Sequence, residues 1–216
     1  MRTEVWPRVR AERIALAGQL DGLAPEQWNE PSWCRGWRVR DVAGHLVYLA
    51  ECTYSRGVAH VWRYGHGVSV NRTVDVTARR LGQREPSELP GRLRAAADGR
   101  YRAPGAPPVA ALAEVVVHGE DIRRPLGLPA AQLEPGELVT LLAFYRRISR
   151  WFLRGSIRGL RLEATDAKWS EGTGAEVRGP ALALLLAMAG RAGACEELAG
   201  DGVGQLRSRS RGARGA

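Results

Sequence analysis

The stretch Glu114-Val-Val-Val-His-Gly-Glu-Asp-Ile-Arg-Arg-Pro-Leu-Gly127 lies in a segment that is predicted to form a helix from about Val109 to Arg123. The proline and the final glycine of the stretch cannot continue a helix, so they mark its end. Glu114 and His118 are four residues apart, so both project from one helix face with their ends about one turn apart. A carboxylate and an imidazole in this arrangement could bind the same ion.

A second predicted helix begins near Arg38 and carries His45 beside an apolar stripe. The members of the stripe follow at spacings of three and four residues: Val39, Val42, Leu46, Leu49 and Cys52. If this helix packs beside the one with Glu114 and His118, His45 supplies a third ligand, and open positions remain for water or substrate. Taken alone, the E-x-x-x-H spacing is a weak signal, because many surface helices contain it by chance.

Three further helices are predicted from periodicity and end signals, over residues 5–23, 86–102 and 135–153. Residues 53–80 are less regular and could be the rest of the second helix plus a loop. His60 and His66 fall in that segment without a matching carboxylate spacing, so we interpret them as non-ligands.

After Gly155 the pattern changes from helical to alternating. Short strands are predicted at 160–165, 175–178 and 203–207, with an apolar helix from residue 179 to about 191 between the last two. We therefore expect a helical domain over residues 1–154, a small α/β domain over 155–206 and a disordered basic tail over 207–216, with no internal repeat.

Composition limits the classes of protein that fit. The chain has 216 residues, 44% of them apolar, which is enough for one large core or for a main domain with a smaller one. The apolar run 181–189 is too short to span a bilayer, which takes about 20 residues. The first residues lack an apolar signal core, so we expect a cytoplasmic protein. Three separate cysteines without a C-x-x-C pair indicate free thiols.

The formal charge of +9 raises the possibility of nucleic-acid binding. The basic residues are nearly all arginine, with Lys168 the only lysine, and they are scattered rather than striped along one helix. This bias is typical of a high-GC genome. A contact between nucleic acid and the tail 207–216 remains an unfavoured alternative.

One stretch of the chain resembles the N-terminal signature of the mycothiol-dependent maleylpyruvate isomerase family. It begins at Trp28 and includes Pro31-Ser-Trp-Cys-Arg-Gly-Trp-Arg-Val-Arg-Asp-Val-Ala-Gly-His-Leu46. This family, of actinobacterial type, belongs to the DinB-like superfamily. The block 114–127 looks like the metal-ligand helix of that family, and the segments 162–166, 169 and 177–181 are similar to its C-terminal domain. The resemblance covers most of the chain, in order; Arg38 departs from it, because a Ser or Thr helix cap often stands there.

The resemblance implies a mainly α fold, a DinB-like four-helix bundle with a small C-terminal α/β domain. It also implies a divalent metal, usually zinc, with His45, Glu114 and His118 as ligands and as catalytic residues through that metal. The family's thiol cofactor, mycothiol, is thought to bind the metal as a thiolate, because a coordinated thiol loses its proton. In the isomerase reaction the thiolate adds to an activated alkene, permits rotation and is expelled; in transferase relatives the adduct is kept.

Several nearby residues have two possible roles. Asp41 could accept a hydrogen bond from the free ring nitrogen of His45, or favour the start of its helix through the dipole. Asp121 could orient His118 or pair with one of the arginines that follow it, and we favour the pairing. Trp33 and Trp37 could line a pocket, although core packing is the commoner fate.

A carboxylate-bearing substrate would call for an arginine in the cleft between the domains, since a guanidinium binds carboxylates through two parallel bonds. Arg178 and Arg191 are the candidates by position, for cofactor binding.

The leading hypothesis is a metal-dependent, mycothiol-using isomerase or S-transferase for a small electrophile, acting as a monomer or homodimer. The ligand set is also compatible with nickel, cobalt or manganese. One alternative is a metal-dependent hydrolase or hydratase without a thiol, and another is a non-catalytic ligand-binding module.

Overall fold

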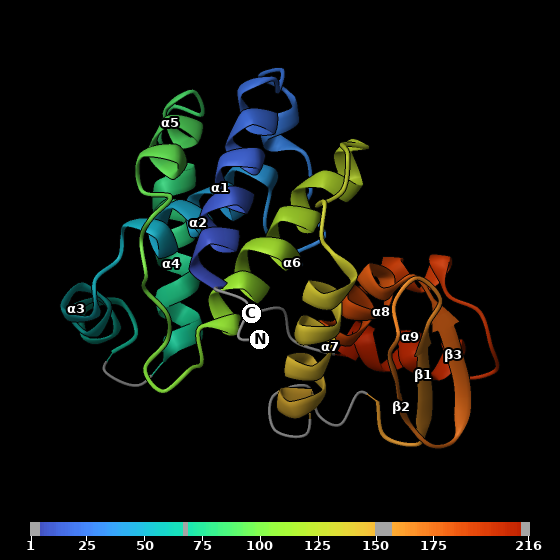
Figure 1. The fold of residues 1–216 in the computed structure, drawn as a ribbon. Coiled ribbons are helices and arrows are strands. Elements are labelled where there is room, and N and C mark those ends of the chain that lie inside the picture. The colour runs from blue at the N-terminus through green and yellow to red at the C-terminus, as the bar shows by residue number, and fades with distance from the viewer. Residues whose placement is uncertain (1–4, 67–68, 150–156, 213–216) are drawn as a thin grey trace. The chain divides into compact units, whose positions relative to one another are not determined.

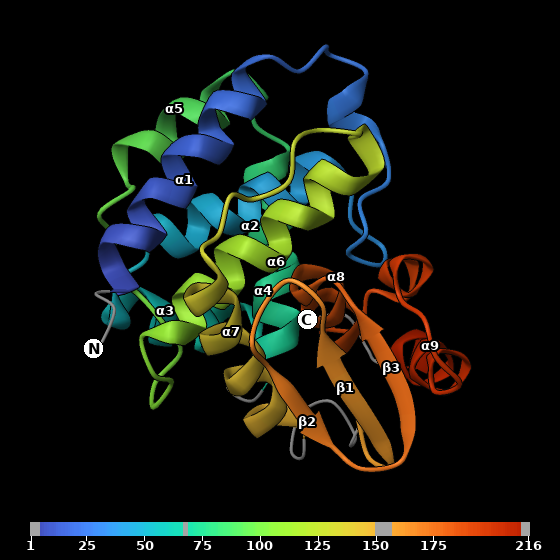
Figure 2. The ribbon, with the colours of Figure 1, turned by 45° about the vertical axis from the view of Figure 1, so that its right-hand side comes forward.

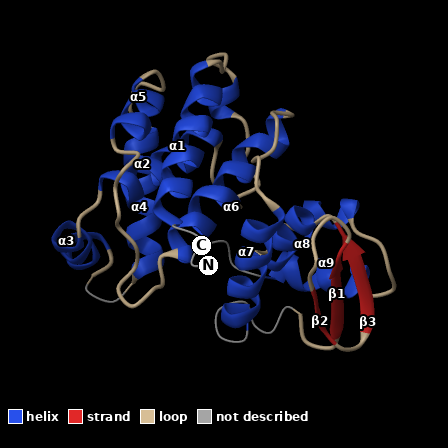
Figure 3. Ribbon diagram, in the orientation of Figure 1, coloured by secondary structure: helices blue, strands red, loops and turns tan. Residues whose placement is uncertain are grey.

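The computed structural model describes residues 5–66, 69–149 and 157–212 and divides the chain into two compact units, one up to Ala131 and one from Gln132 on (Figure 1). The described strands all belong to the second unit (Figure 3). The predicted fold class, mainly α with a small C-terminal α/β part, is confirmed. Among the described helices, none is both long and apolar enough to cross a membrane.

The first unit is a helical bundle. Its helices are α1 (Val5–Asp21), α2 (Val39–Glu51), α3 (Tyr54–Tyr64), α4 (Val70–Gly82), α5 (Glu88–Ala95) and α6 (Val109–Leu126). Helix α2 packs against α4, α5 and α6, and α1 packs against α5 and α6, while α3 lies beside α4 (Figure 1). Four residues of the predicted apolar stripe are buried in this bundle, Val39, Val42, Leu46 and Cys52, whereas Leu49 is half-buried.

Glycine allows α2 and α4 to approach closely. A Cβ atom at Gly44 would lie 2.6 Å from both the Ala78 oxygen and the Gly82 nitrogen, so any side chain there would force the helices apart. At the end of α6, Gly127 has a φ of 64°, and the Leu128 N–H donates to the Arg123 oxygen at 3.0 Å. This is the glycine-terminated helix end that the sequence predicted.

A buried charged network joins α1 to α6. The Arg123 guanidinium, 1% exposed, pairs with Glu12 at 2.6 Å and with Glu120 at 3.3 Å. Breaking such a buried pair leaves an uncompensated charge, which is strongly destabilising. The network therefore fixes α6, and with it the ligand-type residues of that helix, relative to α1.

The second unit contains α7 (Pro135–Ser149), β1 (Leu160–Ala164), β2 (Ser170–Gly172), β3 (Ala175–Gly179), α8 (Ala181–Met188) and α9 (Val203–Gly212). The strand order is β2-β1-β3, with β1 antiparallel to β2 and parallel to β3 (Figure 2). Helix α8 is apolar on all sides because it packs against α7, α9, β1 and β3.

Four elements differ from the sequence prediction. The helix predicted over residues 86–102 is shorter and ends at Ala95. Residues 53–80 form two helices, because Thr53 and Ser69 each accept a hydrogen bond from a backbone N–H three residues on and start a new helix. The short strand β2 was not predicted. Residues 203–207 are not a strand but the start of α9.

Helix α9 also contains residues 207–212 of the predicted disordered tail; residues 213–216 lie outside the described residues. Leu206 is buried, and the Ser210 hydroxyl donates to the Ala187 oxygen of α8 at 2.8 Å. These contacts order a segment that is too polar to order itself. The division between the units falls before α7, whereas the predicted boundary lies near residue 155.

Candidate metal centre

The structure brings His45, Glu114 and His118 together. The His45 Nε2 atom, from α2, lies 3.4 Å from Glu114 Oε2, and the His118 Nε2 atom lies 3.4 Å from the same oxygen. One ligand-type atom from each residue falls within 4.8 Å of the other two. Both imidazoles are 3% exposed, whereas the Glu114 side chain is 45% exposed. Two ring nitrogens and a carboxylate oxygen thus face a common point with one open side.

Trp37 packs against both imidazoles. Its ring centroid lies 5.3 Å from that of His45 and 6.1 Å from that of His118, and it is 5% exposed. Its Nε1–H donates to Asp75 Oδ1 on α4 at 2.9 Å, which fixes the orientation of the indole. Trp37 therefore belongs to the packing around the cluster. Core packing was the role favoured from the sequence over lining a pocket.

Asp121 orients His118. The His118 Nδ1–H donates to Asp121 Oδ2 at 2.9 Å, and both side chains are buried. The arginines that follow bond to Glu120, at 3.3 Å from Arg123 and 2.8 Å from Arg124. The hydrogen bond to His118 supports the orienting role, the less favoured of the two expectations. With Nδ1 bonded to Asp121, Nε2 is the ring nitrogen that faces Glu114.

Asp41 serves the start of α2 rather than His45. Its Oδ2 atom accepts from the Arg38 backbone N–H at 3.0 Å and from Arg38 Nε at 3.2 Å. The His45 Nδ1 atom is buried and has no hydrogen-bond partner within the part of the chain that the structure describes. Of the two roles considered for Asp41, the one at the helix N-terminus is confirmed.

The charges of the cluster depend on one another. Burial alone would raise the pKa of Glu114, but hydrogen bonds from His118 and His45 outweigh it and hold that pKa well below its usual range. Burial lowers the pKa of His45. For His118, burial acts in the same direction, but the hydrogen bonds with Asp121, Cys34 and Glu114 raise its pKa well above the usual value. These shifts favour the charged forms of Glu114 and His118 and disfavour the charged form of His45.

Cys34 forms a second grouping with His118 and Asp121, again with ligand-type atoms within 4.8 Å. All three side chains are buried, and His118 Nδ1 and Asp121 are already bonded to each other. This grouping faces the opposite edge of the His118 ring and supports it. No spacing in the sequence links Cys34 to the cluster, because loop contacts of this kind follow no spacing rule.

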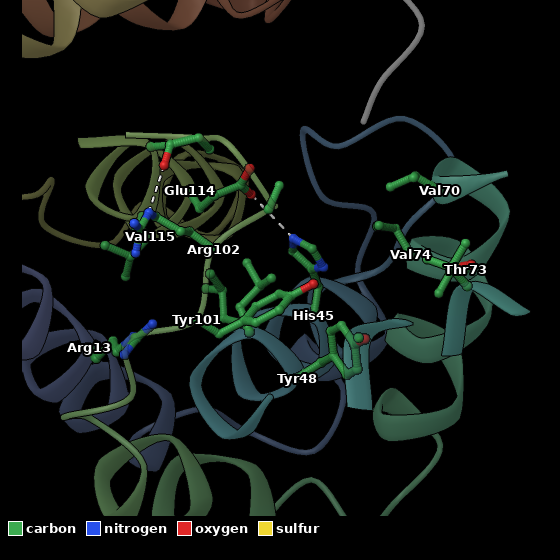
Figure 4. Close-up of a pocket in the computed structure, with 18 residues that line it drawn as sticks. Arg13, His45, Tyr48, Val70, Thr73, Val74, Tyr101, Arg102, Glu114 and Val115 are labelled. Carbon is green, nitrogen blue, oxygen red and sulfur yellow. Dashed lines mark hydrogen bonds and ion pairs between the residues drawn. The ribbon is translucent and has the colours of Figure 1, made fainter. Parts of the chain in front are cut away.

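The open side of the cluster faces a cavity of about 170 Å³ inside the first unit, drawn in Figure 4. His45 and Glu114 face each other at its edge. Apolar side chains make up most of the remaining wall, together with Tyr48 and Tyr101. An apolar cavity with a few convergent polar groups is the usual form of a small-molecule site.

The other predicted residues lie elsewhere. Arg178 is on β3 and exposed, and Arg191 donates to the Ala189 oxygen at 2.6 Å; both belong to the second unit. His60 bonds to the Tyr48 hydroxyl at 3.3 Å and His66 is exposed, so neither joins the cluster, as predicted.

The fold and the site together define the class of protein, a DinB-like helical bundle with a His-Glu-His cluster at the edge of a cavity. The family profile described as the mycothiol maleylpyruvate isomerase N-terminal domain matches residues 9–123, more than half of the 216 residues. The chain therefore belongs to this family.

Solved structures show the same fold. The crystal structure of the mycothiol-dependent maleylpyruvate isomerase is similar with a TM-score of 0.64 and 18% identity over 92% of each chain. A histidine-to-alanine mutant of that enzyme gives a TM-score of 0.63 and 17% identity over 92% of each chain. A comparison with curated proteins finds no match.

Proposed function

We propose that this protein is an enzyme, a mycothiol-dependent isomerase or S-transferase for small electrophilic substrates, with a divalent ion held by His45, Glu114 and His118. The observation that carries the proposal is the convergence of two Nε2 atoms on one carboxylate oxygen at the edge of an apolar cavity. Family membership supports the thiol and the reaction class.

The donor set fits a divalent ion. Two imidazole nitrogens and one carboxylate oxygen are the protein ligands of many catalytic zinc sites and suit several related metals. The hydrogen bond from His118 Nδ1 to Asp121 leaves Nε2 as the free donor atom. When bound, the ion would lower the pKa of a coordinated thiol, so that the thiol would be a thiolate at neutral pH.

The protein's own side chains orient the metal ligands and exclude water from the cluster. Asp121 keeps the proton of His118 on Nδ1, and Trp37 excludes water from the closed side of the cluster. The half-exposed carboxylate of Glu114 faces the cavity, where the thiol and the electrophile would meet. The apolar walls strengthen the electrostatic effect of each charge inside.

Arg178 and Arg191 remain the arginines that the sequence predicts for ligand binding. We place the reaction in the cytoplasm, because a reducing compartment keeps a low-molecular-weight thiol reduced.

The test is an isomerisation assay of the full-length protein with zinc, mycothiol and maleylpyruvate. We expect turnover to the trans isomer that requires both the metal and the thiol. His118→Ala and Glu114→Gln should each lower the rate about a hundredfold or more, because each removes one of three ligands. The matched control is His66→Asn, since His66 is exposed with a φ of 53°, a conformation that asparagine tolerates.

Turnover that persists without any thiol would contradict the proposal and favour the hydrolase or hydratase alternative. Unchanged rates in both ligand variants would show that the cluster is not the active site.

A further inference from the structure

A buried arginine lines the cavity and has no counter-ion among the residues that the structure describes. Arg13, on α1, is 3% exposed, and its Nη1 donates to the backbone oxygens of Ala97 at 3.0 Å and Gly99 at 2.7 Å. These acceptors are neutral, so they satisfy the hydrogen bonds of the guanidinium but not its charge.

No carboxylate of the described residues lies within 4.0 Å of Arg13. The carboxylate that acts on it from farther away belongs to Asp98, which is 84% exposed and pairs with Arg10. Burial lowers the pKa of Arg13 to about 10, which leaves the side chain cationic at neutral pH. A buried charge without a partner is unfavourable, so this part of the cavity favours an anion.

A second arginine lines the same part of the cavity. Arg102 donates from Nε to the Ala106 oxygen at 2.6 Å, and it too has no carboxylate partner in the described segments. In Figure 4, Arg13 and Arg102 lie on one side of the cavity and His45 lies on the other. The backbone contacts hold both guanidinium groups in place before any ligand arrives.

The cavity therefore has charged groups at two places. Glu114 and His45 suit a cation, while the two arginines suit an anion. The rest of the wall is mostly apolar, with side chains such as Leu46 and Leu49, apart from the hydroxyl groups of Tyr48, Thr73 and Tyr101. A small molecule that fits this pattern has a carboxylate on one side and an uncharged reactive carbon on the other.

We propose that Arg13 and Arg102 form an anion-binding subsite that holds a carboxylate group of the substrate and points its reactive carbon toward the His45, Glu114 and His118 cluster. The inference rests on the proposed function and adds to it the residues that recognise the substrate. It assigns this recognition to the helical unit, whereas the arginines predicted from the sequence belong to the second unit.

The experiment measures binding of maleate, a small dicarboxylate, to the full-length protein by titration calorimetry, with dimethyl maleate as the uncharged comparison. We expect Arg102→Gln and Arg13→Gln to weaken maleate binding about 10- to 100-fold, as expected for loss of a charge-assisted hydrogen bond. Dimethyl maleate should bind weakly to all proteins. Arg100→Gln, an exposed change outside the cavity, should leave maleate binding unchanged.

Arg13→Gln also loses contacts to the loop after α5, so circular dichroism checks its fold, and Arg102→Gln supplies an independent result. Maleate affinity that is unchanged in Arg102→Gln and in folded Arg13→Gln would overturn the proposal. Loss of maleate binding in Arg178→Ala alone would also overturn the proposal.

This titration needs no thiol and no turnover. Arginine-dependent maleate binding without mycothiol-dependent activity would contradict the proposed function and support the subsite. Mycothiol-dependent activity with maleate binding unaffected by both arginine changes would contradict only the subsite.

Discussion

Asp121 and His118 are three residues apart on α6 and share a buried hydrogen bond of 2.9 Å. Asp121→Asn removes the charge and permits an amide N–H to face Nδ1, which would place the imidazole proton on the wrong nitrogen. We expect the affinity for zinc to fall about 10- to 100-fold, as for other partners of ligating histidines. Competition with a chromophoric chelator measures this affinity. Asp98→Asn, at an exposed position, should behave as the unchanged protein, and an equal affinity for zinc in both variants would refute the orienting role.

Cys52 gives a pH-dependent prediction away from the cluster. Burial raises the pKa of its thiol, so the folded protein keeps it protonated where the unfolded chain, with a thiol pKa of about 8.5, releases the proton. The buried thiol therefore contributes to stability at pH values below the thiol pKa of the unfolded chain. This contribution is lost as the pH rises toward the higher thiol pKa of the folded protein.

Iodoacetamide labelling, located by mass spectrometry, tests this prediction. At pH 8 Cys52 should react far more slowly in the folded protein than in urea, and the free energy of unfolding should fall as the pH rises above about 8.5. Labelling of Cys52 at equal rates in both states would contradict the burial argument.

The residues of the cluster could be predicted only in part. The spacing of Glu114 and His118 placed them on one helix face, but only the family resemblance joined His45 to them, since helix packing cannot be derived from periodicity. The roles of Asp41 and Asp121 depend on side-chain directions that sequence spacing does not give. Arg13 could not be singled out among so many arginines, because only its burial beside the cavity distinguishes it.

At the scale of elements, the close contact of α2 with α4 depends on Gly44. Gly44→Ala places a Cβ atom 2.6 Å from the backbone of α4, so we expect a loss of about 1–3 kcal/mol in the free energy of unfolding. Gly18→Ala is the matched control, because Gly18 is also inside a helix but faces open space, where alanine should stabilise by about 0.5–1 kcal/mol. Urea denaturation measures both values. Equal effects of the two changes would contradict the proposed contact.

Elements with strong patterns were predicted well and short ones were not. Helix α1, helix α2 and the two parallel strands follow from periodicity, turn residues and alternation. Strand β2 has three residues, Ser-Glu-Gly, which carry no alternation that a sequence could reveal. Helix α9 is polar and is ordered by contacts with α8, so its formation depends on tertiary structure.

At the scale of the whole molecule, the candidate ligands come from α2 and α6 of the first unit. Binding of zinc to the folded state should therefore stabilise that unit, in proportion to the logarithm of the ligand concentration over Kd. We expect zinc to slow hydrogen exchange in residues 39–51 and 109–126, and to leave the strands of the second unit unaffected. Protection confined to the second unit would contradict this location of the site.

The most direct test of the central claim is elemental analysis of the purified full-length protein beside His118→Ala and the control His66→Asn, followed by a mycothiol titration of the cobalt-substituted form. We predict near-stoichiometric metal in the unchanged protein and the control, loss of metal in His118→Ala, and a thiolate charge-transfer band with mycothiol. A protein that contains no metal and cannot be loaded with it would contradict the account.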